Sequence, residues 1–250
     1  MSGEIFQRME ILYGHAAMEI LKDSHVLVLG IGGVGGHCVD ALARCGVGSF
    51  TLVDGDLVSV TNLNRQMVAL HSTLGRLKVD VMRERIQDIN PEAHVYAVPA
   101  FYSESDTLGL WEGQRRYTMV VDAIDSISAK VDIAWNAQRQ NIPCISCMGA
   151  GNKRNPMGFM VADLYQTSVC PLARSMRKAC KEKGVFSLPV VYSKELPQKQ
   201  TAPVYAHREK PLPGSVCFAT AAAGLLLAAE AVSMCLKSSP LNNGTEIFEN

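Results

Sequence analysis

The feature that most constrains this chain is a run of glycines, Gly30-Ile31-Gly32-Gly33-Val34-Gly35-Gly36. A short apolar stretch at 25–29, which predicts a strand, comes directly before it, and a helical pattern continues through 33–45. Glycines at such a junction let the backbone approach a phosphate, and the helix N-terminus supplies unpaired N–H groups. The sequence therefore predicts a nucleotide site here; the alternative is a glycine turn without a ligand.

Strand and helix patterns alternate along most of the chain. Further strands are predicted at 49–53, 93–98, 118–121 and 142–147, and helices at 5–22, 75–89 and 126–140. This alternation predicts an α/β fold: a Rossmann-like, mostly parallel sheet flanked by helices.

The pattern loosens after Gly151, where seven prolines follow between Pro156 and Pro213. We expect a loop-rich C-terminal appendage over 151–215 and an apolar C-terminal helix over 216–237. That helix is interrupted by Glu230. Its uncharged part is shorter than the ~20 residues that a membrane span requires, so we expect it in a core or a dimer interface, with no membrane contact.

Bulk composition excludes some classes of protein. The 250 residues are 48% hydrophobic and 19% charged, with zero formal net charge, which is typical of a folded globule. Any contact with RNA must therefore come from a local basic patch. The eight cysteines are irregularly spaced and the N-terminal residues contain no apolar signal segment, so we expect reduced thiols and a cytoplasmic protein.

Two carboxylates follow the second predicted strand. Asp54 ends it, at the position where a carboxylate accepts ribose hydroxyls. Asp56 comes two residues later, where a solvated turn residue is the alternative. NAD-dependent dehydrogenases share this feature, so it does not separate ATP chemistry from hydride transfer.

Two cations discriminate better. Arg65 stands in Asn62-Leu63-Asn64-Arg65-Gln66, and Lys78 lies shortly downstream. Hydride transfer needs no pair of fixed cations beside a pyrophosphate, whereas adenylation builds charge on the α-phosphate that such cations would neutralise. The alternative is that both are surface cations.

Two further carboxylates, Asp122 and Asp125, follow the strand at 118–121. The carboxyl ends of parallel strands form the ligand edge of open α/β sheets, and a carboxylate there can hold Mg²⁺ against ATP phosphates. The alternative is a helix N-cap, with Asp125 or Ser126 as the capping residue, and we weigh it against metal binding only for Asp122.

Together these motifs resemble the E1-like (ThiF/MoeB) adenylating superfamily, and the resemblance extends over about residues 5–235. It implies a single adenylating domain over 1–250, with a nucleotide-binding core at 5–150, a tRNA- or substrate-side appendage at 151–215 and the C-terminal helix at 216–237. It implies catalytic roles for Arg65, Lys78 and Asp125, with Asp125 holding Mg²⁺. The ATP-binding residues that it implies are Gly30, Gly32, Gly33, Gly35, Asp54, Asp56, Asn62, Arg65, Lys78 and, reaching a partner subunit of a homodimer, Arg8.

A finer resemblance, to the tRNA threonylcarbamoyladenosine dehydratase branch, rests on Leu12-Tyr13-Gly14, Gly149-Ala150-Gly151-Asn152-Lys153, Pro171-Leu172-Ala173-Arg174 and Pro213-Gly214-Ser215-Val216. It implies ATP-dependent cyclisation of N6-threonylcarbamoyladenosine at tRNA position 37. The threonine carboxylate is adenylated, the ureido nitrogen or oxygen closes the ring, and AMP and pyrophosphate are released. A cysteine desulfurase or sulfur-acceptor protein is a further candidate partner.

A basic helix is expected after Pro171. Its cations Arg174, Arg177, Lys178 and Lys181 follow i, i+3, i+4, i+7 spacing and so share one predicted face. Such a face suits several phosphates of tRNA, with a solvated helix face as the alternative.

The cysteines do not predict zinc. Cys144 and Cys147 form one Cys-x-x-Cys pair on a predicted buried strand, whereas a closed structural site needs four ligands. Cys170 is the candidate reactive thiol, although a structural role or simple exposure is favoured over catalysis.

Three functions remain as hypotheses. The first is the ATP-dependent cyclase acting on tRNA. The second is an adenylyltransferase that activates the C-terminus of a small ubiquitin-like sulfur carrier. The third is a non-catalytic Rossmann module or NAD-binding oxidoreductase, in which Arg65 and Lys78 would be idle.

Overall fold

The computed structural model describes residues 2–112, 116–198 and 212–238. In this part of the chain seven strands form one sheet in the order β3-β2-β1-β4-β5-β7-β6, and only β6 runs antiparallel to its neighbour. The strands are β1 (His25–Leu29), β2 (Ser49–Val53), β3 (His94–Val98), β4 (Met119–Asp122), β5 (Cys144–Cys147), β6 (Phe159–Asp163) and β7 (Pro189–Ser193). The helices are α1 (Ser2–Ile5), α2 (Gln7–Tyr13), α3 (His15–Asp23), α4 (Gly35–Arg44), α5 (Lys78–Ile89), α6 (Ile127–Arg139), α7 (Pro171–Lys183) and α8 (Cys217–Ser238).

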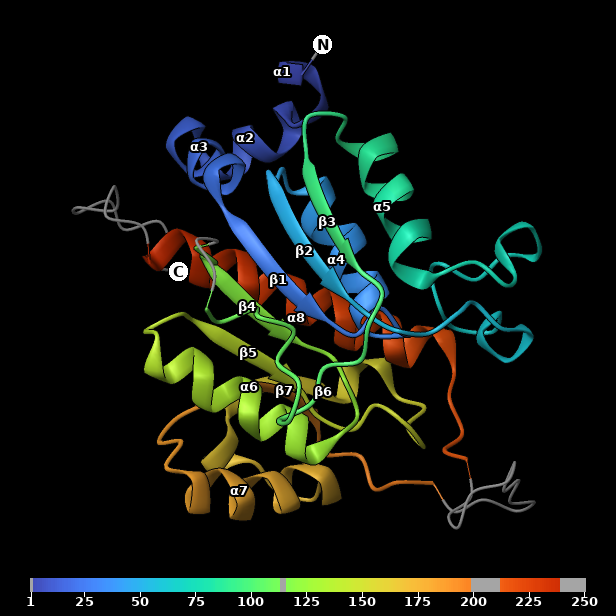
Figure 1. The fold of residues 1–250 in the computed structure, drawn as a ribbon, viewed down its shortest axis with the longest axis vertical. Helices are drawn as coiled ribbons and strands as arrows, with labels where there is room; N and C mark the ends of the chain where they lie inside the picture. Colours follow the sequence, from blue (N-terminus) through green and yellow to red (C-terminus); the bar gives the residue numbers. More distant parts are fainter. Residues whose placement is uncertain (1, 113–115, 199–211, 239–250) are drawn as a thin grey trace.

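Helices cover both faces of the sheet (Figure 1). Alternate residues of each strand point to opposite faces, and their contacts show which helices cover which face. In β1, Val26 and Val28 point into a core shared with α3, α4, α5 and α8. Leu27 and Leu29 point into a second core shared with α6 and α7. The central strands are buried on both faces, as expected for a parallel sheet between two helical layers. The prediction of an α/β fold with a mostly parallel sheet and flanking helices is confirmed.

Helix α8 is an integral part of the first core. It is long and apolar enough by composition to cross a bilayer. In the fold it packs along α4, and a methyl group on Gly224 would lie 2.4 Å from the Val34 carbonyl oxygen, so the two helices approach closely there. The predicted apolar C-terminal helix is confirmed, while Phe218 and Leu225 on its outer side stay about half exposed.

The structure differs from expectation in two places. The helix expected over 5–22 is broken, because Gly14 adopts a φ of +80° between α2 and α3. The loop-rich region after Gly151 contains two strands that join the main sheet: β7 pairs in parallel with β5, and β6 pairs with β7. Pro189 opens β7, and the outermost strand β6 is only partly buried, so neither shows the continuous apolar pattern of a central strand.

The strand register brings three loops to one edge. Leu29 of β1 pairs with Val53 of β2 and with Asp122 of β4. The segments that follow these residues therefore leave the sheet at the same level, between β1 and β4, where the strand order reverses direction. This is the position at which ligands bind in open α/β sheets.

Candidate nucleotide and substrate site

The glycine loop is pressed against the turn that follows β4. Gly30 has a φ of +91°, and a methyl group on it would lie 2.8 Å from the Ala123 carbonyl oxygen. A methyl group on Gly35 would lie 1.8 Å from the Gly30 carbonyl oxygen. Both positions therefore require glycine, and the tight turn that they allow leads into the N-terminus of α4.

Asp54 holds the next part of the loop. Its Oδ2 accepts the backbone N–H of Ile31 at 2.7 Å, and its Oδ1 accepts that of Asp56 at 2.9 Å. Burial raises the pKa of the Asp54 carboxyl, against the opposing attraction of Lys78. Each carboxylate oxygen has a second lone pair, so this group can still accept ribose hydroxyls.

Lys78 opens α5, and its ammonium is directed at the same place. Its Nζ donates to Asp56 Oδ2 at 2.6 Å, although the Lys78 side chain is only 5% exposed and that of Asp56 is 55% exposed. The buried cation is thus held in place by a solvent-facing carboxylate.

The segment between β2 and α5 supplies Asn62 and Arg65. Asn62 is buried, and its Oδ1 accepts the Ser59 N–H at 3.1 Å, which caps a single 3₁₀ turn (Val60–Asn62). Arg65 Nη1 donates to the Thr61 carbonyl at 2.8 Å and to Asn64 Oδ1 at 3.0 Å. Partial burial lowers the pKa of the Arg65 guanidinium. The ordinary pKa of arginine is so high that the group still keeps its charge.

Gln66 is a site residue to which the sequence reasoning gave no role. Its side chain is 92% buried, and its Oε1 has no hydrogen-bond partner among the described residues. Its Nε2 is the nearest atom to a methyl group built on Gly32, at 3.9 Å. An unsatisfied buried acceptor costs about 1–3 kcal/mol, so this oxygen fits a site completed by a ligand that carries an O–H or N–H donor.

The two aspartates after β4 have different surroundings. Asp122 is buried in an ion pair with Lys130, with Nζ 3.0 Å from Oδ2, and it accepts the Ser146 hydroxyl at 2.6 Å. Asp122 is therefore occupied by a structural ion pair rather than by a helix cap, and Lys130 is a partner that the sequence reasoning missed. Asp125 is exposed and makes no hydrogen bond or ion pair with the described residues, so its carboxylate is available to a ligand.

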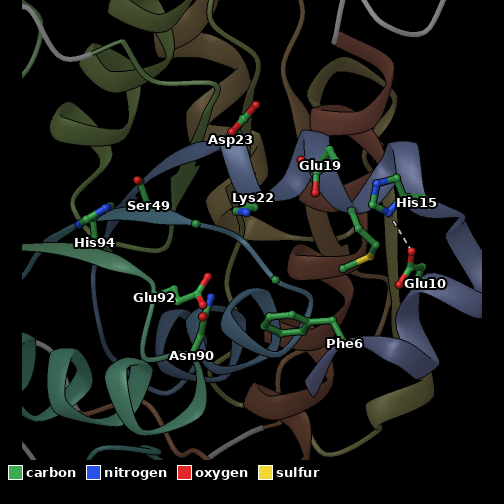
Figure 2. A pocket seen from close by; sticks show the side chains of 13 residues that line it. Phe6, Glu10, His15, Glu19, Lys22, Asp23, Ser49, Asn90, Glu92 and His94 are labelled. Atoms are coloured by element: carbon green, nitrogen blue, oxygen red, sulfur yellow. Dashed lines mark hydrogen bonds and ion pairs between the residues drawn. The ribbon is translucent and has the colours of Figure 1, made fainter. Parts of the chain in front are cut away.

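Arg8 does not join these residues. It is exposed on α2, which lies with α1 and α3 at the opposite edge of the sheet, beside the start of β1 (Figure 1). That edge contains a hollow of about 640 Å³ lined by Phe6, Met18, Ser49, Glu92 and His94, among other residues (Figure 2). Within one chain, Arg8 is therefore remote from the glycine loop.

Helix α7, which contains the predicted basic residues, packs against α6. Ala173, Met176 and Cys180 are buried, and the exposed cations on the outer side are Arg174, Lys178 and Lys181. Arg177 differs from the expectation of one shared face, because it is partly buried and donates to both oxygens of Thr167.

The cysteine pair in β5 is divided by the sheet. Cys144 contributes to the core under α6 and α7, whereas Cys147 contributes to the core under α4 and α8. Burial raises the pKa of Cys147 to about 12. Among residues 2–112, 116–198 and 212–238 no three His, Cys, Asp or Glu side chains are grouped to hold a metal. Cys170, the candidate reactive thiol, is 97% buried.

Comparison with known proteins shows the family to which the chain belongs. Residues 6–249 match the ThiF family, so this chain belongs to the ThiF family. A relative named tRNA threonylcarbamoyladenosine dehydratase, from Bacillus subtilis, is 39% identical over 242 residues, which are 93% of this chain and 94% of the relative.

Two further proteins are similar to this chain, at different degrees of identity. The crystal structure of Escherichia coli tRNA N6-threonylcarbamoyladenosine dehydratase in complex with ATP superimposes with a TM-score of 0.84 at 33% identity, covering 94% of this chain and 95% of that one. The molybdopterin-synthase adenylyltransferase of Salmonella typhimurium is more distant, at 30% identity over 84% of this chain and 85% of the relative.

Proposed function

We propose that this protein is an ATP-dependent tRNA threonylcarbamoyladenosine dehydratase. It converts N6-threonylcarbamoyladenosine at tRNA position 37 to its cyclic form through an acyl-adenylate. One observation carries the nucleotide part of the proposal: the glycine loop, the Asp54 carboxylate, the Lys78 ammonium and the Nε2 of Gln66 meet at one edge of the sheet. The similarity to dehydratases over nearly the whole chain supports the substrate.

Groups of opposite charge bind the two ends of the nucleotide: a carboxylate at the ribose and cations at the phosphates. Asp54 accepts the ribose hydroxyls, and the glycine loop at Gly30, Gly32, Gly33 and Gly35 accommodates phosphate oxygens at the start of α4. Arg65 and Lys78 neutralise the phosphate charge, with Asn62 and Asp56 shaping their surroundings. Gln66 Nε2 donates to a phosphate oxygen beside Gly32, whereas the unpaired Oε1 is an acceptor and needs a donor from elsewhere.

The reaction follows from this arrangement in two steps. A carboxylate oxygen of the threonyl group attacks the α-phosphorus, the α–β phosphate bond breaks, and pyrophosphate leaves. The ureido group then attacks the acyl carbon, closes the ring and loses a proton, while AMP departs with one oxygen of the former carboxylate. The tRNA has then lost one water overall.

Asp125 is the proposed ligand for magnesium. It follows β4 at the ligand edge and is free of protein partners in the described chain. Mg²⁺ typically takes only one or two protein carboxylates and completes its octahedron with phosphates and water. The ion supplies charge neutralisation on the phosphates, and Asp125 fixes its position.

The remaining parts of the proposal concern the substrate and the assembly. The outer cations of α7 bind phosphates of tRNA. The chain forms one adenylating domain, in which residues 5–150 are the nucleotide-binding core, 151–215 the substrate side and 216–237 the C-terminal helix. The half-exposed Phe218 and Leu225 of α8 suit a homodimer interface, which would bring Arg8 to the partner's phosphates. The protein is placed in the cytoplasm with its tRNA.

An isotope experiment tests the acyl-adenylate directly. Modified tRNA carrying ¹⁸O in the threonyl carboxylate is incubated with Mg-ATP, and AMP is analysed by mass spectrometry. One ¹⁸O atom in AMP, together with cyclised nucleoside, is the expected result. If this tRNA is left unchanged while a sulfur-carrier C-terminus stimulates ATP–pyrophosphate exchange, the adenylyltransferase function replaces this proposal.

A further inference from the structure

The side chain of Asn64 joins the phosphate-binding segment to a distant part of the chain. Its Oδ1 accepts the Arg65 guanidinium at 3.0 Å. Its Nδ2 donates to the Ser215 carbonyl at 3.0 Å, across 151 positions of sequence. One amide therefore contacts the proposed phosphate-binding cation at one end and the segment that leads into α8 at the other.

That segment is itself fixed to the loop after β5. Asn152 donates its backbone N–H to the Gly214 carbonyl at 2.7 Å, and its Oδ1 accepts the Gly214 N–H at 2.7 Å. Its carbonyl accepts the Gln198 N–H at 2.8 Å. Asn152 has a φ of +57°, a conformation that asparagine tolerates better than most residues. A single residue thus anchors two chain segments.

The same loop touches the start of α7. A methyl group on Gly149 would lie 3.8 Å from Leu172 Cβ. Lys153, next to Asn152, is buried and donates to the Glu195 carbonyl. The loop that carries Asn152 therefore lies near α7 at Gly149, and hydrogen bonds link it to Gly214–Ser215 and, through Asn64, to Arg65.

We propose that Asn64 is a positioning residue that couples tRNA binding to the orientation of Arg65, and so to nucleotide affinity. This inference rests on the proposed function, since it takes α7 as the tRNA face and Arg65 as a phosphate ligand. A shift of Gly214–Ser215 on tRNA binding changes the restraint on the Asn64 amide, and the amide passes that change to the guanidinium. Because coupling between two ligands is reciprocal, ATP tightens tRNA binding by the same factor.

Asn64→Asp separates the two contacts. Aspartate keeps an oxygen for Arg65 but has no N–H for Ser215. The affinity for the analogue α,β-methylene-ATP, in which the bond that must break is blocked, is measured without and with saturating modified tRNA. In wild type we expect the tRNA to tighten analogue binding by about 5-fold or more, which is the lower range of allosteric coupling. In Asn64→Asp we expect that factor to fall to near 1. The added carboxylate beside Arg65 should also weaken analogue binding without tRNA, so the readout is the ratio of the two affinities within each variant.

Variants at Asn152 provide an independent test of the same coupling. Asn152→Gly keeps the positive φ but removes the acceptor for Gly214, so the coupling should fall as it does in Asn64→Asp. Asn152→Asp keeps an acceptor and should restore it. Asn141→Asp, the same chemical change on an exposed residue just past the end of α6, is the matched control and should keep the wild-type factor.

The outcomes separate this inference from the proposed function. Wild type that cyclises the modified tRNA but shows no coupling overturns the inference and leaves the function standing. Full coupling in Asn64→Asp also overturns it. Wild type that neither binds nor cyclises the tRNA refutes the proposed function, and the inference falls with it.

Discussion

Lys130 forms an ion pair with Asp122 directly behind the turn that carries Asp125, with 0% and 1% of the two side chains exposed. Lys130 Nζ also donates to the Ile124 carbonyl at 3.0 Å, inside that turn. The pair therefore joins α6 to the end of β4 and fixes the backbone against which Gly30 packs. The site thus depends on a buried charge pair that would not itself contact the nucleotide.

Removing one member of this pair should be costly. Lys130→Met leaves the Asp122 carboxylate buried without its cation, and we expect a loss of about 3–5 kcal/mol in the free energy of unfolding. Urea denaturation monitored by circular dichroism measures it. The double variant Asp122→Asn with Lys130→Met should recover much of the loss, because no unpaired charge remains; equal instability of the two variants would contradict this explanation.

Gln66→Glu tests the proposed role of Gln66 Nε2 as a phosphate donor. The substitution keeps the shape of the side chain but replaces a donor with a negative charge beside Gly32. We expect ATP–pyrophosphate exchange to fall by about 100-fold, as happens when a donor to developing charge is lost. An exchange rate within a few-fold of wild type, in a variant of unchanged stability, would exclude this role for Gln66.

The basic face of α7 predicts a salt-dependent effect on tRNA affinity. Changing Arg174, Lys178 and Lys181 to glutamate should weaken binding strongly, and should flatten the dependence of log affinity on log salt by about one for each phosphate contact removed. Lys22→Glu, an exposed cation of α3 at the opposite edge of the sheet, should have little effect and serves as the control. Unchanged affinity and slope in the triple variant would refute the assignment.

Asp40 predicts a pH dependence of stability. Burial alone would raise the pKa of this carboxyl, but hydrogen bonds from Arg44 and Arg85, at 2.9 and 2.6 Å, hold it below its usual value. A depressed pKa means that the stabilisation is present above the ordinary aspartate range and is lost as pH falls through the folded-state value. Asp40→Asn should therefore cost about 1–2 kcal/mol at pH 7. The difference from wild type should disappear in strong acid; a difference independent of pH would contradict this.

The sequence predicted the parts of the fold that depend on local pattern. The strands at His25–Leu29 and Ser49–Val53 have the predicted bounds, because each is a short, mainly apolar run ended by a turn. The strands β6 and β7 were missed, because an edge strand and a proline at a strand start lack that pattern. The Gly14 break was missed because helical periodicity continues across it.

For the site, sequence spacing placed Gly30, Asp54 and Lys78 at one edge, and the parallel register brings them together. Sequence spacing could not predict contacts between segments that are distant in the chain. The Lys130–Asp122 pair and the bond from Asn64 to Ser215 depend on tertiary packing that no local motif encodes. The unpaired state of Gln66 likewise appears only once its surroundings are in place.

The most direct test is to incubate the protein with Mg-ATP and tRNA carrying threonylcarbamoyladenosine, and to analyse the nucleosides by mass spectrometry. Asp125→Ala and Arg65→Ala are run beside wild type. The account predicts that wild type removes one water from the modified nucleoside with one AMP formed per event, and that both variants lose this activity while remaining folded. An unchanged nucleoside with wild-type protein that binds ATP would contradict the account, as would full activity in either variant.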